Sequence, residues 1–358
     1  MRTYTCAVIA AGSQGRVHAR GYQAAGARLV AIADTDKASV AALAAELDVP
    51  GVYTHYADLL AAERPEVLSI CTPPAVRLEV VRAAVRSGVL AIHCEKPLAT
   101  SYAEVLEMQR LTAEAGVQFS VNLQRRFEPV HQFARAQLAD GCLGDVVAIE
   151  GYCPNLGDWG SHIVDLMLFY LGDQRPAWVM GQVDVSLNRY VYGAFAETSS
   201  LTLMRWPGGI NGLVVTGREP HTPVLNLENS LGLIVQGTRG RLDVRGARCV
   251  IRRFGQDDIS FESPFSRDTT TWERGVDPAI VAGTGQAIAD LLRALEAGRP
   301  PLLEAGSAVA GAEVIFATYE SSRSRRRVVL PLDPCDNALL SGLHEGFWQP
   351  AGELRSTY

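Results

Sequence analysis

The sequence predicts a two-domain α/β protein, with an N-terminal doubly wound parallel sheet and a C-terminal α+β domain on a large, open, mostly antiparallel sheet. The length of 358 residues is enough for about two domains of ordinary size. Up to residue 123, apolar strand segments alternate with helical segments, which is the pattern of a parallel sheet. Beyond that point short strands separated by turns dominate, as in antiparallel sheets. We therefore expect domains at 1–123 and 124–333 and a C-terminal tail at 334–358.

The first domain is predicted to contain five strands with helices between them. Two of the helices end before a glycine, Gly88 and Gly116, which tolerates the positive φ that a helix end often requires. The strands are expected at 5–11, 28–33, 67–71, 90–94 and 118–123, and the helices at 16–25, 38–47, 75–87 and 102–115.

The second domain is predicted to alternate less regularly. Short strands are expected between 178 and 261, separated by turns that contain glycine and proline. The other elements are expected to be helices at 127–138, 161–171, 278–297 and 307–324 and strands at 145–152 and 327–330. Residues 334–358, with Phe347 and Trp348, are expected to form an irregular docked tail.

The composition excludes several classes of protein. With 47% hydrophobic and 20% charged residues, the chain has enough apolar material for two cores and is not of the disordered type. Its net charge of −6 makes it a poor nucleic-acid binder, because contacts to phosphate need a basic face. No apolar run is long enough to span a bilayer, and the N-terminus does not resemble a signal peptide. The seven cysteines lack the spacing of a disulfide framework or a zinc site, so we expect a cytoplasmic protein without a metal.

A glycine-rich turn follows the first predicted strand and opens the first helix. The segment Ala10-Ala11-Gly12-Ser13-Gln14-Gly15 matches the dinucleotide-binding pattern G-x-G-x-x-G with alanine at its first glycine. The middle glycine lets the backbone approach a pyrophosphate, which a helix N-terminus favours, and the last allows close packing of helix on strand. The alternative is a glycine turn without a ligand. Cofactor contacts are therefore expected from Ala11, Gly12, Ser13, Gln14 and Gly15.

Asp34 indicates which dinucleotide the turn would bind. It ends the second predicted strand about 20 residues after Gly12, where a carboxylate binds the ribose hydroxyls. A carboxylate there would repel a 2′-phosphate, and Lys37 is the only cation within several residues. We therefore expect NAD, with NADP disfavoured.

Lysine is rare in this chain, which contains only Lys37 and Lys96 and otherwise uses arginine. A lysine, unlike an arginine, exchanges a proton near neutral pH when its surroundings lower its pKa. Lys96 lies in Glu95-Lys96-Pro97 at the end of the fourth predicted strand, and open α/β sheets bind ligands at that edge. Lys96 is thus a candidate proton acceptor; the alternative is a surface ion pair with Glu95.

Three polar side chains mark the start of an apolar helix in the second domain. Asp158, His162 and Asp165 are spaced i, i+4 and i+7, so they fall on one helix face. Such a stripe is unusual beside the apolar run at 166–171. The alternative is a buried structural His–Asp pair. A metal site would need a third or fourth ligand of matching geometry, and none is evident.

Four motifs together resemble the glucose–fructose oxidoreductase and inositol dehydrogenase family (Gfo/Idh/MocA). They are the glycine-rich turn, Cys71-Thr72-Pro73-Pro74, Glu95-Lys96-Pro97 and the D-x-G-x-H-x-x-D pattern at 158–165. The resemblance covers roughly residues 4 to 332. It implies an N-terminal Rossmann domain, a second domain whose open sheet forms oligomer contacts, and oxidation of a secondary alcohol on a sugar or cyclitol, or the reverse reduction.

The resemblance also implies a role for individual residues. Lys96 and His162 would be the acid/base groups, Asp158 would orient or tune them, and Asp165 would contact substrate hydroxyls. Trp159, inside the motif, would supply an apolar face for a sugar ring. Further contacts are implied for Thr72, Pro73, Glu95 and Lys96 to the cofactor and for Gln124, Arg125 and Arg126 to the substrate.

Two features depart from the family's pattern. Arg77 stands where a histidine often follows the T-P motif, which puts one cofactor contact in doubt. The segment 153–157 before Asp158 is short and lacks the usual Gly-Gly run. These departures leave the substrate unassigned.

The expected function is that of an NAD-dependent dehydrogenase acting on a small-molecule sugar, glycoside or cyclitol, as a homodimer or homotetramer through the second domain's sheet. One alternative with the same residues is an NAD-dependent glycoside hydrolase, which oxidises a ring hydroxyl transiently, eliminates the aglycone, adds water and reduces the product. A third interpretation is a non-catalytic NAD- or sugar-sensing regulator, which would not need Lys96 and His162.

Overall fold

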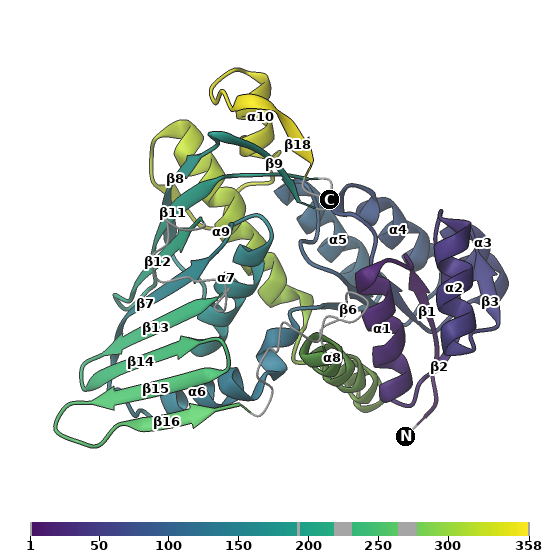
Figure 1. The fold of residues 1–358 in the computed structure, drawn as a ribbon, viewed down its shortest axis with the longest axis horizontal. Helices are drawn as coiled ribbons and strands as arrows, with labels where there is room; N and C mark the ends of the chain where they lie inside the picture. The colour runs from purple at the N-terminus through teal and green to yellow at the C-terminus, as the bar shows by residue number, and fades with distance from the viewer. Residues whose placement is uncertain (1, 192–193, 218–230, 264–277, 357–358) are drawn as a thin grey trace. The chain divides into compact units, whose positions relative to one another are not determined.

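The structure is a computed structural model that describes residues 2–191, 194–217, 231–263 and 278–356. It divides into two compact units (Figure 1). The first unit comprises Met1–Ala99, Glu104–Phe127 and Asp268–Ala308, and the second Thr100–Ala103, Glu128–Arg267 and Val309–Tyr358. The first contains a parallel sheet and the second a mostly antiparallel one, which confirms the predicted fold class.

The first unit is built on a six-stranded parallel sheet with the order β3-β2-β1-β4-β5-β6. The central strands are buried along almost their whole length, which is why they appear in the sequence as continuous apolar runs rather than as an alternating pattern. The strands are β1 (Thr5–Ile9), β2 (Arg28–Ala33), β3 (Gly51–Tyr53), β4 (Val67–Ile70), β5 (Ala91–Cys94) and β6 (Gln118–Val121). The accompanying helices are α1 (Ser13–Ala24), α2 (Lys37–Leu47), α3 (Tyr56–Glu63), α4 (Pro74–Ser87), α5 (Tyr102–Glu114) and α8 (Pro278–Ala297).

Two elements between α2 and β4 are absent from the sequence prediction. Strand β3 pairs in parallel with β2 at the edge of the sheet, and α3 follows it directly. A strand of three residues is too short to show a recognisable hydrophobic pattern. Its place is set by pairing with β2 rather than by its own composition.

Helix α8 comes from the distant C-terminal part of the chain and packs on α1 in the first unit. The small residue Gly21 allows the close approach, since a Cβ there would lie 2.9 Å from the side chain of Ile288. Tyr22, Ile288 and Leu291 are buried in one core. A boundary at residue 123 places this helix in the second domain, whereas its apolar face completes the core of the first.

The second unit is built on a nine-stranded sheet with the order β16-β15-β14-β13-β7-β12-β11-β8-β17. Neighbouring strands are antiparallel except for β7 and β12, which are parallel. The strands are β7 (Val146–Cys153), β8 (Trp178–Asp184), β11 (Ser199–Arg205), β12 (Asn211–Thr216), β13 (Gly232–Gly237), β14 (Gly240–Arg245), β15 (Arg248–Arg253), β16 (Ile259–Glu262) and β17 (Val328–Val329).

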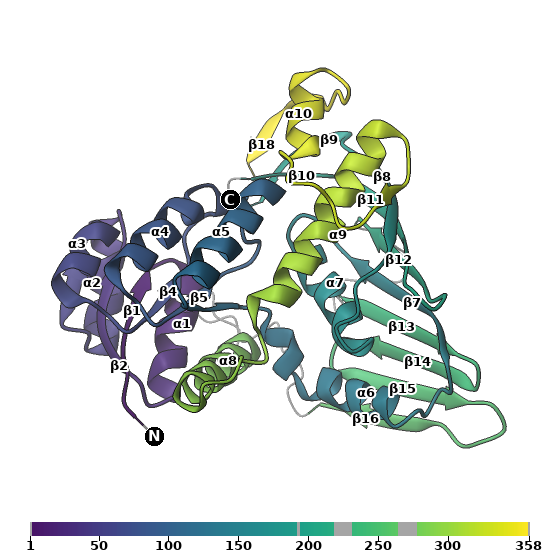
Figure 2. The same cartoon turned by 180° about the vertical axis from the view of Figure 1, so that it is seen from behind.

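Helices α6 (Pro129–Ala139), α7 (Trp159–Tyr170) and α9 (Ala305–Ser324) lie against one face of this sheet (Figures 1 and 2). Phe133 of α6 stacks on Phe261 of β16, with ring centroids 4.6 Å apart. Gly151 and Gly181 face α7 and α9 respectively, where a Cβ would overlap a helix side chain. In the described ranges, no helix is both long and apolar enough to cross a membrane.

Residues 334–356 do not form the irregular tail that the sequence predicts for 334–358. They contain α10 (Ala338–His344), whose first N–H groups are capped by the side chain of Asn337, and β18 (Ala351–Ser356). Strand β18 pairs in parallel with β9 (Leu187–Val191), which also pairs with β10 (Ala194–Ala196). The prediction was wrong because a seven-residue helix shows little periodicity and β18 forms through a distant strand.

The substitution Gly15→Ala should destabilise the first unit strongly. A Cβ at residue 15 would lie 2.7 Å from the carbonyl carbon of Ala10 and closer still to its oxygen, so α1 or the turn would have to shift. Overpacking at a well-packed site costs about 1–3 kcal/mol, and occasionally more, in the free energy of unfolding. Gly12→Ala is the matched control, because a Cβ there meets nothing within 4 Å and the residue has a φ of −67°. Thermal unfolding should show a lowered midpoint for Gly15→Ala only; equal midpoints would contradict this packing role.

Candidate functional site

The glycine-rich turn joins β1 to α1 and leaves the helix N-terminus open. Ala10 has a φ of 81°, a conformation that favours glycine and explains why the pattern usually has glycine there. Gly12 is the N-cap of α1, and no side chain caps the first N–H groups. A Cβ at Gly12 would meet nothing within 4 Å, while Gly15 packs on the Ala10 carbonyl. The turn therefore has the shape and the free donors that a pyrophosphate requires.

Asp34 lies directly beside this turn, after the end of β2. Its Oδ2 accepts the N–H of Ala11 at 2.6 Å and its Oδ1 accepts the N–H of Asp36 at 2.8 Å. Asp36 caps α2, and hydrogen bonds from the Ser39 hydroxyl and from the N–H groups of Ser39 and Ala38 lower its pKa. Two carboxylates, those of Asp34 and Asp36, thus lie after the end of β2, and Asp34 bonds directly to the glycine-rich turn.

The Glu95-Lys96-Pro97 segment follows β5 at the same edge of the sheet. Arg77 of α4 is buried, and its guanidinium donates to the carbonyl oxygens of Thr72 at 2.7 Å, Glu95 at 2.5 Å and Pro97. The residue that departs from the family's pattern is therefore a clamp that fixes the lysine segment and the T-P motif together.

The Glu95 side chain is buried at the centre of a polar network. Its Oε1 lies 3.0 Å from Nε2 of His18 and accepts from Nδ2 of Asn122 at 2.7 Å, and its Oε2 accepts the N–H of Lys96 at 3.0 Å. Burial by itself would raise the pKa of Glu95. The hydrogen bond and charge of His18, the charge of Lys96 and the hydrogen bond from Asn122 outweigh burial and hold the pKa at about 2. A negative charge is therefore fixed beside Lys96.

Gln124, Arg125 and Arg126 form a short 3₁₀ helix, Gln124–Phe127, which follows β6 in the first unit. All three side chains are buried. Gln124 packs on α8, where a Cβ at Gly283 would lie 3.2 Å from its Cγ. The stretch is thus a rigid part of the first unit rather than an exposed loop.

In the second unit, Asp158 is the N-cap residue of α7, and His162 and Asp165 follow on the helix. The three side chains are exposed by only 6%, 4% and 1%, so the predicted polar face is buried. Asn155 starts the helix in place of Asp158, because its Oδ1 accepts the N–H of Asp158 at 2.8 Å and of Trp159 at 3.2 Å. The Asp158 carboxylate is therefore not used as the cap of its own helix.

The loop before Asp158 is held by the fully buried Glu197. One of its oxygens accepts the N–H of Leu156, and the other accepts the hydroxyl of Tyr319 of α9 at 2.9 Å. Burial raises the pKa of Glu197, and these hydrogen bonds only partly offset it. Glu197 thus connects α9 to the loop that sets where α7 begins.

The predicted site residues fall into two groups, one in each unit. All the predicted cofactor contacts, Lys96 and the 124–126 stretch belong to the first unit, whereas Asp158, Trp159, His162 and Asp165 belong to the second. Sequence reasoning missed the residues that support both groups: His18, Asn122, Asn155 and Glu197. Asn122 could have been predicted from the sequence, because it directly follows a parallel strand at the same edge of the sheet as Lys96.

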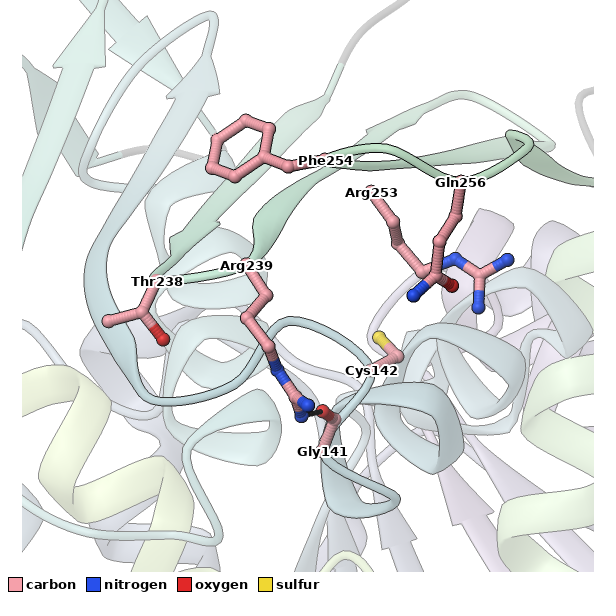
Figure 3. Close-up of a pocket in the computed structure, with 7 residues that line it drawn as sticks. All are labelled: Gly141, Cys142, Thr238, Arg239, Arg253, Phe254 and Gln256. Atoms are coloured by element: carbon pink, nitrogen blue, oxygen red, sulfur yellow. Dashed lines mark hydrogen bonds between the residues drawn. The ribbon is translucent and has the colours of Figure 1, made fainter.

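A separate cavity of about 260 Å³ opens in the second unit (Figure 3). No predicted site residue lines it. Its seven lining residues are Gly141, Cys142, Thr238, Arg239, Arg253, Phe254 and Gln256. Within the described part of the chain, no group of three or more His, Cys, Asp or Glu residues could hold a metal ion.

A sequence model of an oxidoreductase family with an NAD-binding Rossmann fold, GFO_IDH_MocA, matches residues 4–123. Residues 4–123 of this chain therefore match the Gfo/Idh/MocA oxidoreductase family. The matched range contains all six strands of the parallel sheet and the Lys96 segment, so the family resemblance carried by the motifs is confirmed.

Known proteins resemble this chain at low identity. Inositol 2-dehydrogenase of Rhizobium meliloti is 25% identical over 272 residues, which is 71% of this chain and 77% of that protein. D-apiose dehydrogenase of Paraburkholderia graminis is 28% identical over 192 residues, and the match spans 48% of this chain and about half of that protein. Levoglucosan dehydrogenase, solved with NADH and levoglucosan, has a TM-score of 0.78 at 16% identity and covers 92% of this chain and 100% of its own; this likeness concerns the fold.

The substitution Glu197→Gln should stabilise this protein increasingly as the pH rises. A carboxyl whose pKa is raised in the folded state stabilises the fold at pH values below its unfolded pKa. This contribution is lost as the pH rises through the folded pKa. Glutamine keeps an acceptor for Leu156 and has no such dependence. The difference in thermal midpoint between variant and wild type should therefore move in the variant's favour between about pH 4.5 and pH 8.

Glu95→Gln is the matched control with the opposite sign. The pKa of Glu95 is lowered to about 2, so its contribution to stability is present at neutral pH and is lost as the pH falls toward 2. The deficit of Glu95→Gln should shrink on acidification. A pH-independent difference for both variants would contradict the two opposite pKa shifts.

Proposed function

We propose that this protein is an NAD-dependent dehydrogenase that transfers hydride between a secondary alcohol of a sugar, glycoside or cyclitol and nicotinamide. The observation that carries the proposal is the fixed Lys96 segment. It lies at the carboxyl edge of the parallel sheet with its backbone bound to an ionised, buried Glu95. The names of the relatives, which are dehydrogenases of inositol, apiose and levoglucosan, support the substrate class.

Each chemical role in this reaction falls to a residue type suited to it. When bound, NAD supplies the hydride acceptor; the protein's own task is to position the alcohol and take its proton. We assign that proton to Lys96 or His162, because both side chains, unlike an arginine, can accept and release a proton. Asp158 orients or tunes them, and Asp165 accepts hydrogen bonds from substrate hydroxyls.

The remaining assignments follow the same logic. Thr72 and Pro73 contact the cofactor beside the Arg77 clamp, and Asp34 selects NAD over NADP. Arg125 and Arg126, with Gln124, contact the substrate from the rigid 3₁₀ helix. Trp159, the first residue of α7, offers its indole face to a sugar ring.

We also propose self-association through the helix-free face of the nine-stranded sheet, as a homodimer or homotetramer. That face presents Met180 of β8 and Leu201 and Leu203 of β11, which are 49%, 44% and 43% exposed. Neighbouring apolar side chains exposed on adjacent strands favour burial against a second copy. Light scattering after size exclusion would give the mass of the assembly, and a monomer would remove this part of the proposal.

The activity is tested with purified protein and excess NAD on a panel of cyclitols, free sugars and aryl glycosides. Absorbance at 340 nm reports NADH, and phenol released from aryl glycosides is read in parallel. NADH that accumulates with a free sugar or cyclitol supports the dehydrogenase. Phenol release without lasting NADH would identify a glycoside hydrolase with the same residues, and no turnover together with NAD binding would favour a regulator.

Lys96→Arg should lose most turnover while keeping the fold. Arginine keeps the positive charge but stays protonated, so it cannot accept the alcohol proton. General-base catalysis contributes about 10²–10⁴-fold, and the fall in kcat should lie in that range with NAD affinity nearly unchanged. Lys37→Arg is the control, being the only other lysine. Near-normal kcat in Lys96→Arg would refute the role of Lys96.

A further inference from the structure

We propose that His18 is a positioning residue for this reaction, which acts through the buried carboxylate of Glu95 to set the charge environment of Lys96. This inference rests on the proposed function only in naming Lys96 as the base. The structural observations that carry it are independent of any substrate. They concern the contacts of His18, the convergence of donors on Glu95, and the neutrality of the other nearby ionisable groups.

His18 lies on α1, three residues after Gly15, and is completely buried. Its Nε2 is 3.0 Å from Oε1 of Glu95, and its Nδ1 is 2.9 Å from the Ser69 hydroxyl, which bonds in turn to the Tyr22 hydroxyl at 2.9 Å. Because an ionised carboxylate only accepts hydrogen bonds, the proton between His18 and Glu95 resides on Nε2. His18 is thus a directed donor to Glu95.

Glu95 receives donors from three parts of the first unit. His18 comes from α1, the N–H of Lys96 from the chain after β5, and Nδ2 of Asn122 from the residue after β6. The Asn122 amide also lies 3.1 Å from Oγ1 of Thr284, which places α8 behind the same network. A buried carboxylate with this many donors keeps its charge and its orientation.

The other ionisable groups packed around Glu95 are mostly neutral. Burial raises the pKa values of Cys71 and Tyr22 well above their usual range and that of Cys94 to about 11, and burial lowers the pKa of His93 to about 3. The ionisable groups that act on Glu95 are His18 on α1, Cys71 after β4, Arg77 on α4, His93 and Cys94 on β5, and Lys96. Arg77 directs its guanidinium to carbonyl oxygens.

The electrostatic coupling therefore runs from His18 through Glu95 to Lys96. A negative carboxylate stabilises a nearby ammonium, and Lys96 is among the groups whose charge lowers the pKa of Glu95. By linkage Glu95 acts equally on Lys96 and favours its protonated form. His18 is the partner that most lowers the pKa of Glu95 and it holds one carboxylate oxygen in place, so losing this donor weakens the effect and makes Lys96 a weaker base.

Three variants distinguish the hydrogen bond that His18 donates to Glu95 from the space that its imidazole ring fills. In His18→Gln the amide nitrogen takes the position of Nε2, so the bond to Glu95 is kept. In His18→Asn the amide takes the position of Nδ1, so the Ser69 contact is kept and the Glu95 bond is lost. His93→Asn is the matched control, because His93 is equally buried, lies 4.9 Å from the His18 ring, and bonds to Ser120 through Nδ1 at 3.1 Å.

The two lysines of the chain allow a direct measurement. Reductive methylation with ¹³C-formaldehyde labels Lys37, Lys96 and the chain N-terminus, and Lys37→Arg assigns the signals. A pH titration by NMR then gives the pKa of Lys96 in the apoprotein, with Lys37 as internal reference. We expect Glu95→Gln to lower the Lys96 pKa by about 1–3 units, the range for one neighbouring charge. His18→Asn should lower it in the same direction, while His18→Gln and His93→Asn should leave it unchanged.

The same variants are also compared in steady-state kinetics, with whichever alcohol the protein oxidises as substrate. The acid limb of the kcat profile should move to lower pH in His18→Asn, and kcat on the plateau should fall about tenfold with KM for NAD little changed. His18→Gln should restore both. The proposal is overturned if the Lys96 pKa is unchanged in His18→Asn or in Glu95→Gln. If one of these variants does not fold, the Lys96 pKa of the other decides. Absence of any turnover would count against the proposed function alone, because the NMR titration needs neither substrate nor NAD.

Discussion

The buried carboxylate of Glu95 is the interaction on which the arrangement of the first unit depends. An ionised carboxylate removed from water costs several kcal/mol unless donors replace its hydration. Here the replacement comes from His18, Asn122 and the backbone of Lys96, residues far apart in the sequence. Helix α1 and the ends of β5 and β6 must therefore meet in one register, and α8 closes the network through Thr284. The same contacts that stabilise the charge hold Lys96 at the edge of the sheet.

The second unit contains a buried carboxyl with the opposite electrostatics. Glu197 accepts from a backbone N–H and a tyrosine hydroxyl, which are neutral donors, so burial dominates and its pKa is raised. Glu95 has charged partners, and its pKa is lowered. One carboxyl fixes a negative charge beside a lysine, and the other fixes a loop before a helix with Asp158 and His162. The difference lies in the partners, since both groups are equally removed from water.

Much of the fold and part of the site follow from the sequence. The ends of β2 and α8 and the buried polar face of α7 agree with the sequence prediction. Each of these elements is long, strongly periodic or ended by a clear signal. Strand β3, helix α3 and the tail elements α10 and β18 do not, because they are short and form through distant partners. The packing role of Gly15 was predictable from its motif, whereas the contacts of Arg77 and His18 were not, since nothing local distinguishes them from ordinary helix residues.

By itself the sequence determined the class of the protein: an alternating pattern that makes a parallel sheet, a turn that leaves a helix N-terminus open, and a lone lysine at a strand end. These are local properties, set by backbone conformation and side-chain chemistry within a few residues. The tertiary structure alone decided which side chains surround Glu95, that Arg77 clamps three carbonyls, and that α8 completes the first core. Those outcomes depend on burial and on partners tens to hundreds of residues away, and no local pattern encodes them.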